Sequence, residues 1–380
     1  MIAVSRLLCG LRAPGDALRF EGEDAKRDTR PVVVWNITRT CNLRCAHCYA
    51  SSENAAYPGE LTTSQAMAVI DDLAEFRAPV ILFSGGEPLL RRDLFDLASR
   101  AAEKGIRCVL STNGTLIDGS AAERIRSAGF AYVGVSIDGV GEAHDEIRGQ
   151  KGCFDAAIRG LRHCRDAGLR TGLRFTMHRL NVAELPGIFE LAESEDIARV
   201  CIYHLAYSGR GGRMARHDLL PAETRAAVDY IFARARSLPG REILTVDNHA
   251  DAAYLYLTLR AEEEQRAAET HRLLRCSGGN RSGIAIVCID NLGDVHPDQF
   301  SWHQNLGNVM RRPFSHIWQD GSNGVLSVLR DRRPHLKGRC ASCRFLDICN
   351  GNLRARAYAA AGDWLAPDPA CYLTDCEIGL

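Results

Sequence analysis

Three cysteines near the start of the chain have a spacing that suits metal chemistry. Cys41, Cys45 and Cys48 are separated by three and then two residues, directly after an apolar run at 32–37. A tight loop leaving a strand would direct three thiolates at one small volume, which suits a [4Fe–4S] cluster with one iron left free. A free iron can bind a small molecule and pass it an electron. A structural zinc loop, with His47 as the fourth ligand, is the alternative.

A second group of four cysteines, Cys340, Cys343, Cys349 and Cys371, lies in a loop-rich tail. Four thiolates suit a fully ligated second [4Fe–4S] cluster. Zinc is the alternative, because cysteine pairs separated by two residues are its commonest setting. Cys376 is a rival to Cys371 for the fourth position.

Composition limits the remaining function classes. The chain has 380 residues, of which 46% are hydrophobic, and its 47 basic and 47 acidic residues give a net charge of +0. These values predict a globular protein with no field that would attract nucleic acid or a membrane surface. The first ten residues lack the apolar run of a signal peptide and no stretch resembles a membrane span, so we expect a cytoplasmic protein. Fifteen cysteines then indicate metal or redox chemistry and argue against a disulfide scaffold.

Short apolar runs alternate with amphipathic stretches from residue 32 onward, which predicts βαβ units and a parallel sheet. The predicted strands are at 32–37, 80–84, 106–111, 132–137, 170–176 and 200–203. The predicted helices are at 63–76, 92–104, 120–128, 154–167 and 184–195, with glycines at three of their C-terminal ends. Six such units predict an α/β fold, a partial (β/α)6 barrel of the TIM type.

Changes in composition along the chain predict four regions. Residues 1–30 are polar and charged and suggest an N-terminal extension, and 31–215 would form the partial barrel. Residues 216–275 suggest a helical linker region with helices near 222–237 and 251–274. Residues 276–380 would form a C-terminal domain that begins with a β-hairpin at 284–296 and contains the four-cysteine group.

Polar motifs follow the predicted strands at the end where chemistry gathers in such barrels. Residues 84–88 follow the second strand, 111–114 the third, and 136–139 close the fourth. In the motif Gly85-Gly86-Glu87-Pro88, two glycines allow a close approach to the backbone, and a carboxylate can accept hydrogen bonds from an ammonium group.

In this order, the motifs resemble those of the radical S-adenosylmethionine (SAM) superfamily over roughly residues 31–205. The resemblance implies that the three cysteines hold a [4Fe–4S] cluster and that SAM chelates its free iron. Cleavage of SAM would give a 5′-deoxyadenosyl radical. Glu87 would hold the SAM amine and His47 would lie near the adenine. The remaining SAM contacts implied by the resemblance are Gly85, Gly86, Pro88, Ser111, Thr112, Asn113, Ser136 and Asp138. Arg174, inside the fifth predicted strand, is a further candidate that could bind the SAM carboxylate, and a salt bridge at the edge of the core is the alternative.

The tail resembles the SPASM extension of many radical SAM enzymes, which binds auxiliary iron–sulfur clusters. Its cysteine spacing favours iron–sulfur over zinc and Cys371 over Cys376. Two cysteines of a full extension are missing, because Asp298 and Leu353 stand at their positions. The resemblance therefore implies one auxiliary cluster, with Cys276 unligated or in another role.

Segments at 294–300, 306–318, 349–357 and 367–375 resemble the tetrapyrrole-modifying branch of this superfamily, above all its enzyme of haem d1 biosynthesis. The resemblance implies action on 12,18-didecarboxysirohaem, with loss of propionate side chains. Alternatives are haem synthesis by oxidative decarboxylation, acetate removal, peptide maturation and, outside enzymes, an iron–sulfur electron carrier or a zinc-stabilised binding protein. The implied partners are an iron tetrapyrrole and an electron donor such as flavodoxin or ferredoxin. Candidate cleft residues are His178, Tyr203, His204, Arg210, Arg213 and His296.

Overall fold

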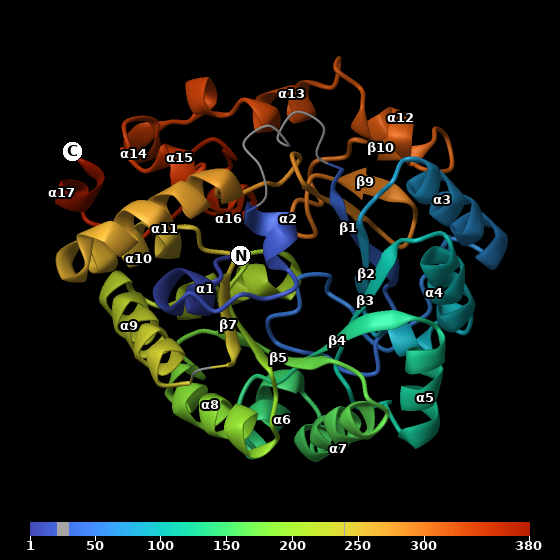
Figure 1. The fold of residues 1–380 in the computed structure, drawn as a ribbon. Helices are drawn as coiled ribbons and strands as arrows, with labels where there is room; N and C mark the ends of the chain where they lie inside the picture. Colours follow the sequence, from blue (N-terminus) through green and yellow to red (C-terminus); the bar gives the residue numbers. More distant parts are fainter. Residues whose placement is uncertain (21–29, 239) are drawn as a thin grey trace.

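The computed structural model describes residues 1–20, 30–238 and 240–380, and their strands form one curved sheet (Figure 1). The sheet has ten strands in the order β10-β9-β8-β1-β2-β3-β4-β5-β6-β7. Strands β1 to β7 are parallel to one another. A parallel sheet with helices on its outer face confirms the predicted α/β barrel.

The six predicted strands are present, with ends shifted by at most two residues. They are β1 Val32–Thr38, β2 Val80–Gly85, β3 Arg107–Thr112, β4 Phe130–Ser136, β5 Thr171–Met177 and β6 Arg199–His204. The helices between them are α3 Thr63–Glu75, α4 Leu94–Glu103, α5 Gly119–Ser127, α6 Glu142–Arg148, α7 Cys153–Asp166 and α8 Leu185–Ser194. Of these, only the short helix α6 was not predicted.

Local sequence explains why these elements form where they do. The central strands are continuous apolar runs, as expected for strands buried on both faces, and Trp35, Phe83 and Phe175 are almost fully buried among them. Thr62 caps α3 in a capping box with Gln65, which satisfies backbone donors at the start of the helix. Gly105 follows α4 with a φ of 83°, the left-handed conformation that ends helices.

The region predicted as a helical linker contains a seventh strand, β7 Glu242–Val246, which pairs with β6. Its helices are α9 Pro221–Ser237, α10 Ala250–Glu262 and α11 Glu264–Ser277. The prediction missed β7 because five residues between two charged helical stretches give a weak periodic signal. The single helix predicted at 251–274 is broken at Glu263, whose φ of −153° is extended.

The N-terminal residues belong to the barrel and do not extend away from it. Ile2 pairs with Thr245 of β7, and helix α1 Val4–Cys9 packs against α9 and β7. Ile2, Val4 and Leu7 are almost fully buried, because this short apolar run covers the free edge of β7. Helix α2 Asp16–Phe20 follows, and residues 21–29 of the predicted extension lie outside the described residues.

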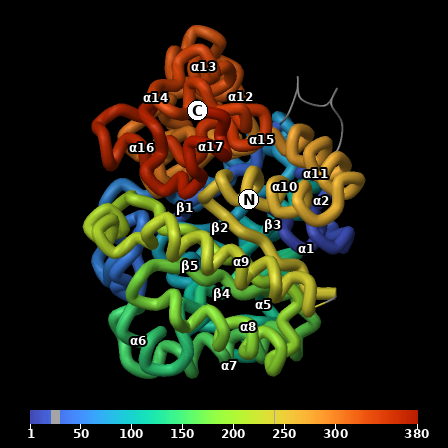
Figure 2. Tube along the Cα trace, turned by 90° about the vertical axis from the view of Figure 1, so that its left-hand side faces the viewer, coloured from blue at the N-terminus to red at the C-terminus, as the bar shows by residue number. Residues whose placement is uncertain are grey.

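The C-terminal region extends the same sheet and then lies over one end of the barrel (Figure 2). The predicted hairpin is confirmed as β8 Ile286–Ile289 and β9 Asp294–His296, and β8 pairs in parallel with β1. The remaining elements are β10 Gly307–Asn308, α12 Phe314–Trp318, α13 Gly324–Arg330, α14 Gly338–Ala341, α15 Leu346–Cys349, α16 Arg354–Ala361 and α17 Asp375–Ile378. None of the described helices is long and apolar enough to cross a membrane.

Candidate functional site

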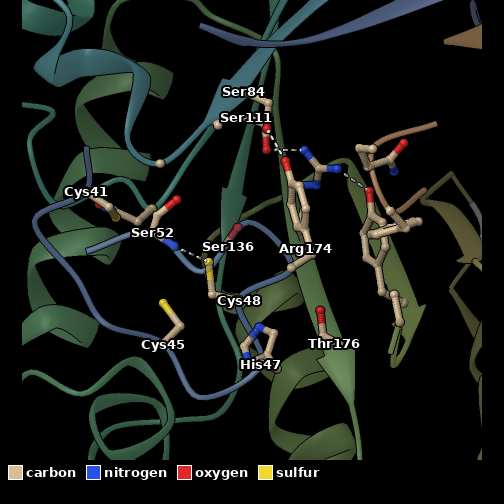
Figure 3. Close-up of a pocket in the computed structure, with 18 of the residues that line it drawn as sticks. Cys41, Cys45, His47, Cys48, Ser52, Ser84, Ser111, Ser136, Arg174 and Thr176 are labelled. Atoms are coloured by element: carbon tan, nitrogen blue, oxygen red, sulfur yellow. Dashed lines mark hydrogen bonds between the residues drawn. The ribbon is translucent and has the colours of Figure 1, made fainter. Parts of the chain in front are cut away.

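A cavity that opens to solvent lies at the C-terminal ends of the barrel strands. The structure brings most of the sequence-predicted site residues together on its walls (Figure 3). They are Cys41, Cys45, His47, Cys48, Gly85, Gly86, Ser111, Thr112, Asn113, Ser136 and Arg174. Glu87, Pro88 and Asp138 are buried and do not line the cavity.

Each sulfur of the cysteine loop, residues 41–48, accepts a hydrogen bond. The backbone N–H of Leu43 donates to Cys41 Sγ at 3.4 Å, and that of Ser52 donates to Cys48 Sγ at 3.4 Å. The Arg148 guanidinium donates to Cys45 Sγ at 3.6 Å. N–H donors around cysteine sulfurs stabilise thiolates and tune iron–sulfur clusters. This donor set fits a cluster held by the three cysteines.

Burial keeps Cys41 and Cys45 protonated in the absence of a metal. It raises the pKa of Cys41 to about 12 and also raises that of Cys45, so iron would have to displace their protons. Within the described part of the chain, no three His, Cys, Asp or Glu side chains converge tightly enough to share one metal ion. A cluster does not require such convergence, because each thiolate binds a different iron.

Gly85 and Gly86 allow a close approach of another segment of the chain, and this approach does not involve a ligand. A Cβ on Gly85 would lie 2.2 Å from the carbonyl oxygen of Thr38, and one on Gly86 would lie 2.1 Å from that of Thr40. The N–H of Gly86 donates to the Thr38 carbonyl at 2.8 Å. The two glycines therefore dock the end of β2 against the segment that leads into the cysteine loop.

Glu87 is fully buried, and both of its carboxylate oxygens accept hydrogen bonds from the protein. Its partners are the N–H of Leu89 at 3.1 Å, the hydroxyl of Thr112 at 2.8 Å and the N–H of Asn113 at 2.8 Å. Burial raises the pKa of Glu87, and these hydrogen bonds offset only part of the effect. Glu87 thus fixes the end of β3, and its contact with the SAM amine stays a prediction.

His47 lines the cavity and pairs with a buried carboxylate behind the wall. Its Nε2 lies 3.3 Å from Asp138 Oδ2, and the Arg148 guanidinium lies 2.5 Å from the same oxygen. Burial alone would raise the pKa of Asp138, but Arg148 and His47 hold it at about 2. Burial lowers the pKa of His47 although Asp138 opposes this effect, and the buried Nδ1 has no hydrogen-bond partner in the described residues.

The opposite wall carries Arg174 on β5, which the sequence had suggested as a SAM contact. Its guanidinium donates to the hydroxyls of Ser111 and Tyr203, both at 2.5 Å. A guanidinium has five N–H donors, so these two bonds leave capacity for an acidic ligand. On the side of the cysteine loop, the buried hydroxyl of Ser52 has no hydrogen-bond partner within the described residues, as expected of a group that faces a ligand.

Arg210 lines the cavity, but its guanidinium holds the cysteine loop. It donates to the carbonyl of Cys45 at 2.7 Å and to that of Ser52 at 2.8 Å. Tyr203 and His204 line the cavity as expected, although His204 Nε2 is bound to Asp251 at 2.9 Å. The other three proposed cleft residues do not line it, namely His178, Arg213 and His296.

Asp247 is a cavity residue that sequence reasoning missed. It follows β7 with a φ of 68°, which is strained for a residue other than glycine, and burial raises its pKa to about 6. Its carbonyl accepts a hydrogen bond from Arg356 at 2.8 Å, which fixes the backbone. A lone carboxylate after an unpredicted strand gives no sequence signal.

The four C-terminal cysteines, called here the four-cysteine site, lie together outside the cavity. Burial raises the pKa of Cys349, and the neighbouring charges of Cys371, Cys340 and Cys343 raise it further. The charges of Cys340 and Cys349 also act on buried Arg354, whose Nε and Nη2 have no hydrogen-bond partner among described residues. A buried guanidinium with unused donors beside four cysteines fits a negatively charged cluster.

The residues in place of the missing cysteines have structural roles. Asp298 is buried and accepts hydrogen bonds from the hydroxyl of Ser282 at 2.5 Å and from the N–H of Phe300 at 2.9 Å. Leu353 packs against Phe300 in an apolar cluster behind the cavity. Cys276 is buried in α11, and Cys376 is exposed.

Comparisons with known proteins identify the family and the fold. Residues 35–192 match the radical SAM superfamily. The chain is 51% identical to Fe-coproporphyrin III synthase from Methanosarcina barkeri, with 100% of this chain and 99% of the relative covered. It is 44% identical to pre-heme d1 synthase from Dinoroseobacter shibae, with 93% and 89% covered. SuiB of Streptococcus suis bound to S-adenosylmethionine shares the fold, with a TM-score of 0.72 at 17% identity over 92% of this chain and 80% of that chain.

Proposed function

We propose, on the premise that the chain belongs to the radical SAM superfamily, that it removes carboxylated side chains from an iron tetrapyrrole of the 12,18-didecarboxysirohaem class. Membership of the superfamily implies a [4Fe–4S] cluster and SAM, and both relatives are named for tetrapyrrole products. The observation that carries the proposal is the open cavity, which has three hydrogen-bonded cysteine sulfurs on one wall. Unactivated side-chain bonds lie beyond acid–base chemistry, which makes a radical cofactor necessary.

The chain's own residues would bind and orient the two substrates. When bound, the cluster supplies the electron that cleaves SAM. Ser52 and His47 offer unpaired polar atoms near the cysteines, and Arg174 offers spare donors to an acid across the cavity. Tyr49 and Phe300 pack edge to face at 5.4 Å and give the cavity an aromatic side suited to a flat macrocycle.

Two products are compatible with this chemistry. The sequence-based interpretation is loss of two propionate side chains towards haem d1, which the 44% identical relative supports. The 51% identical relative, aligned along the whole chain, favours a second candidate in which acetate side chains are removed to give Fe-coproporphyrin III. The shared part of the proposal is the acidic, iron-containing tetrapyrrole.

Product analysis separates these candidates. The anaerobically reconstituted protein is incubated with SAM, dithionite and 12,18-didecarboxysirohaem, and the tetrapyrrole products are identified by mass spectrometry. Loss of propionate side chains supports the haem d1 reaction, and loss of acetate side chains with all propionates kept supports the second candidate. Turnover of Fe-coproporphyrin III to haem, with no turnover of 12,18-didecarboxysirohaem, would overturn both.

We also propose that the four-cysteine site holds a second, fully ligated [4Fe–4S] cluster that relays an electron or contacts substrate. Its support is the grouping of four buried or half-buried cysteines beside unused donors of Arg354. Anaerobic reconstitution tests it directly. About eight irons per chain are expected, and about four would contradict a second cluster.

A further inference from the structure

Helix α6, which the sequence pattern did not reveal, is built against the cysteine loop. The N–H of Ala46 donates to the carbonyl of Ile147 at 2.9 Å, near the C-terminal end of the helix. Gly149, with a φ of 73°, ends α6, and a Cβ there would lie 3.0 Å from the carbonyl oxygen of Arg44. The helix therefore approaches the loop closely enough to place its last residue beside a cysteine.

That last residue is Arg148, which is 8% exposed and lines the cavity. Its Nη1 donates to Cys45 Sγ at 3.6 Å, and its Nη2 lies 2.5 Å from Asp138 Oδ2. Asp138 is itself fully buried, and its other oxygen accepts a hydrogen bond from the N–H of Thr176 at 2.9 Å. The Arg148 guanidinium thus contacts Cys45 on one side and the buried carboxylate of Asp138 on the other.

Charges in this position act on electron transfer. A buried positive charge stabilises the more negative, reduced form of a neighbouring cluster, and N–H donors to its sulfurs act in the same direction. A buried negative charge does the opposite. Because both side chains are shielded from solvent, their effects are screened far less than those of a surface charge.

We infer that Arg148 is a positioning residue that raises the reduction potential of the cluster bound by the cysteine loop, and that Asp138 is the counter-charge limiting this effect. Arg148 thereby sets how easily the electron donor can reduce the site. The inference rests on the cluster of the proposed function and is independent of which tetrapyrrole is the substrate.

Three charge variants test this inference, each reconstituted anaerobically and titrated by electron paramagnetic resonance without tetrapyrrole. The signal of the open cluster is identified by its change on addition of SAM. R148Q is expected to shift the midpoint potential negative, and D138N is expected to shift it positive. Arg44 is the matched control, because it lies in the same loop with its side chain 70% exposed, and R44Q should leave the potential unchanged.

Opposite shifts in R148Q and D138N cannot arise from general damage to the loop. An unchanged potential in R148Q, with weakened SAM binding, would overturn the inference and make Arg148 a SAM ligand instead. If R148Q binds too little iron to titrate, R148K is measured, since it keeps the charge. A potential in R148K close to that of the unaltered protein supports the inference, and failure of both variants to assemble the cluster would overturn it in favour of a purely structural role. If neither the variants nor the unaltered protein shows a SAM-sensitive signal, the proposed function is wrong.

Discussion

The three cysteines of the loop line the cavity, whereas the four-cysteine site lies outside it. The loop is held from a distance, by Arg210 after β6 and by Arg148 at the end of α6. At the four-cysteine site, Arg354 of the same region donates to the carbonyls of Trp364 and Ala366, and Asn248 after β7 donates to the carbonyl of Ala370, next to Cys371. We expect the cysteine loop, which faces the cavity, to be the site of chemistry and the four-cysteine site to store or relay electrons.

Removing one cysteine from each site tests this comparison most strongly. Cys45→Ala should lose about four irons and reduce 5′-deoxyadenosine formation to background. Cys343→Ala should also lose about four irons, yet it should retain SAM cleavage in the absence of tetrapyrrole. Iron analysis and chromatography of 5′-deoxyadenosine check both. Loss of SAM cleavage in both variants would contradict the separation of roles.

A fully buried arginine anchors the C-terminal region on the barrel. Replacing this arginine should therefore destabilise the contact between the two. Arg356 is paired with Asp368 at 2.7 Å and donates to the carbonyls of Leu205 and Asp247, both at 2.8 Å. Arg356→Met leaves the Asp368 charge unpaired, and we expect a loss of about 3–5 kcal/mol in the free energy of unfolding, measured by anaerobic urea titration.

The matched control for that variant is an exposed ion pair on α5. Arg126 lies 2.9 Å from Glu123, and both side chains are more than half exposed. Arg126→Met should cost less than about 1 kcal/mol. Equal losses in the two variants would mean that Arg356 does not anchor the C-terminal region.

Asp247, on the rim between the two regions, gives a pH-dependent prediction. Burial raises its pKa from an ordinary value of 3.8 to about 6 in the folded protein, so the folded state binds the proton more tightly. The stability from this proton is present below the unfolded pKa and is lost as the pH rises through about 6, at most about 3 kcal/mol. Asp247→Asn should therefore raise the melting temperature at pH 8 and not at pH 4. An equal change at both pH values would contradict this.

Arg210, which donates hydrogen bonds to the cysteine loop, should contribute little to the stability of the fold and more to iron retention. Arg210→Met removes the hydrogen bonds to the carbonyls of Cys45 in the loop and Ser52 just after it, and we expect iron at the loop to be released to a chelator about tenfold faster. Iron at the four-cysteine site should be unaffected. Arg213→Met, at an exposed position in the same segment, is the control. Equal rates of iron release in the two variants would show that Arg210 does not hold the cysteine loop in place.

The sequence predicts those parts of the site that depend on local pattern. Cysteine spacing and strand ends are local, and Cys41, Ser111 and Ser136 accordingly meet at one cavity. The orientation of Glu87 into the protein was not predictable, because Thr112 and Asn113 on the next strand decide it. Glycines at 85 and 86 were attributed to ligand approach, and only the pairing of strands reveals their contact with the chain.

The elements that the sequence pattern did not reveal share one physical cause. Helix α6 and strand β7 are short, so neither completes enough periods to stand out. Both are stabilised by long-range contacts, α6 through Ile147 to the cysteine loop and β7 through Ile2 at the N-terminus. Arg148 and Asp247 lie at the ends of these two elements, so missing the elements meant missing the residues.

The central claim is that the cysteine loop is an open site for SAM that acts on an iron tetrapyrrole. The measurement that tests it most directly is 5′-deoxyadenosine formation by the reconstituted protein with dithionite and SAM, with and without 12,18-didecarboxysirohaem. The account predicts formation in both cases, with a clear increase when the tetrapyrrole is present. Absence of 5′-deoxyadenosine from a preparation that contains iron in the loop would contradict it.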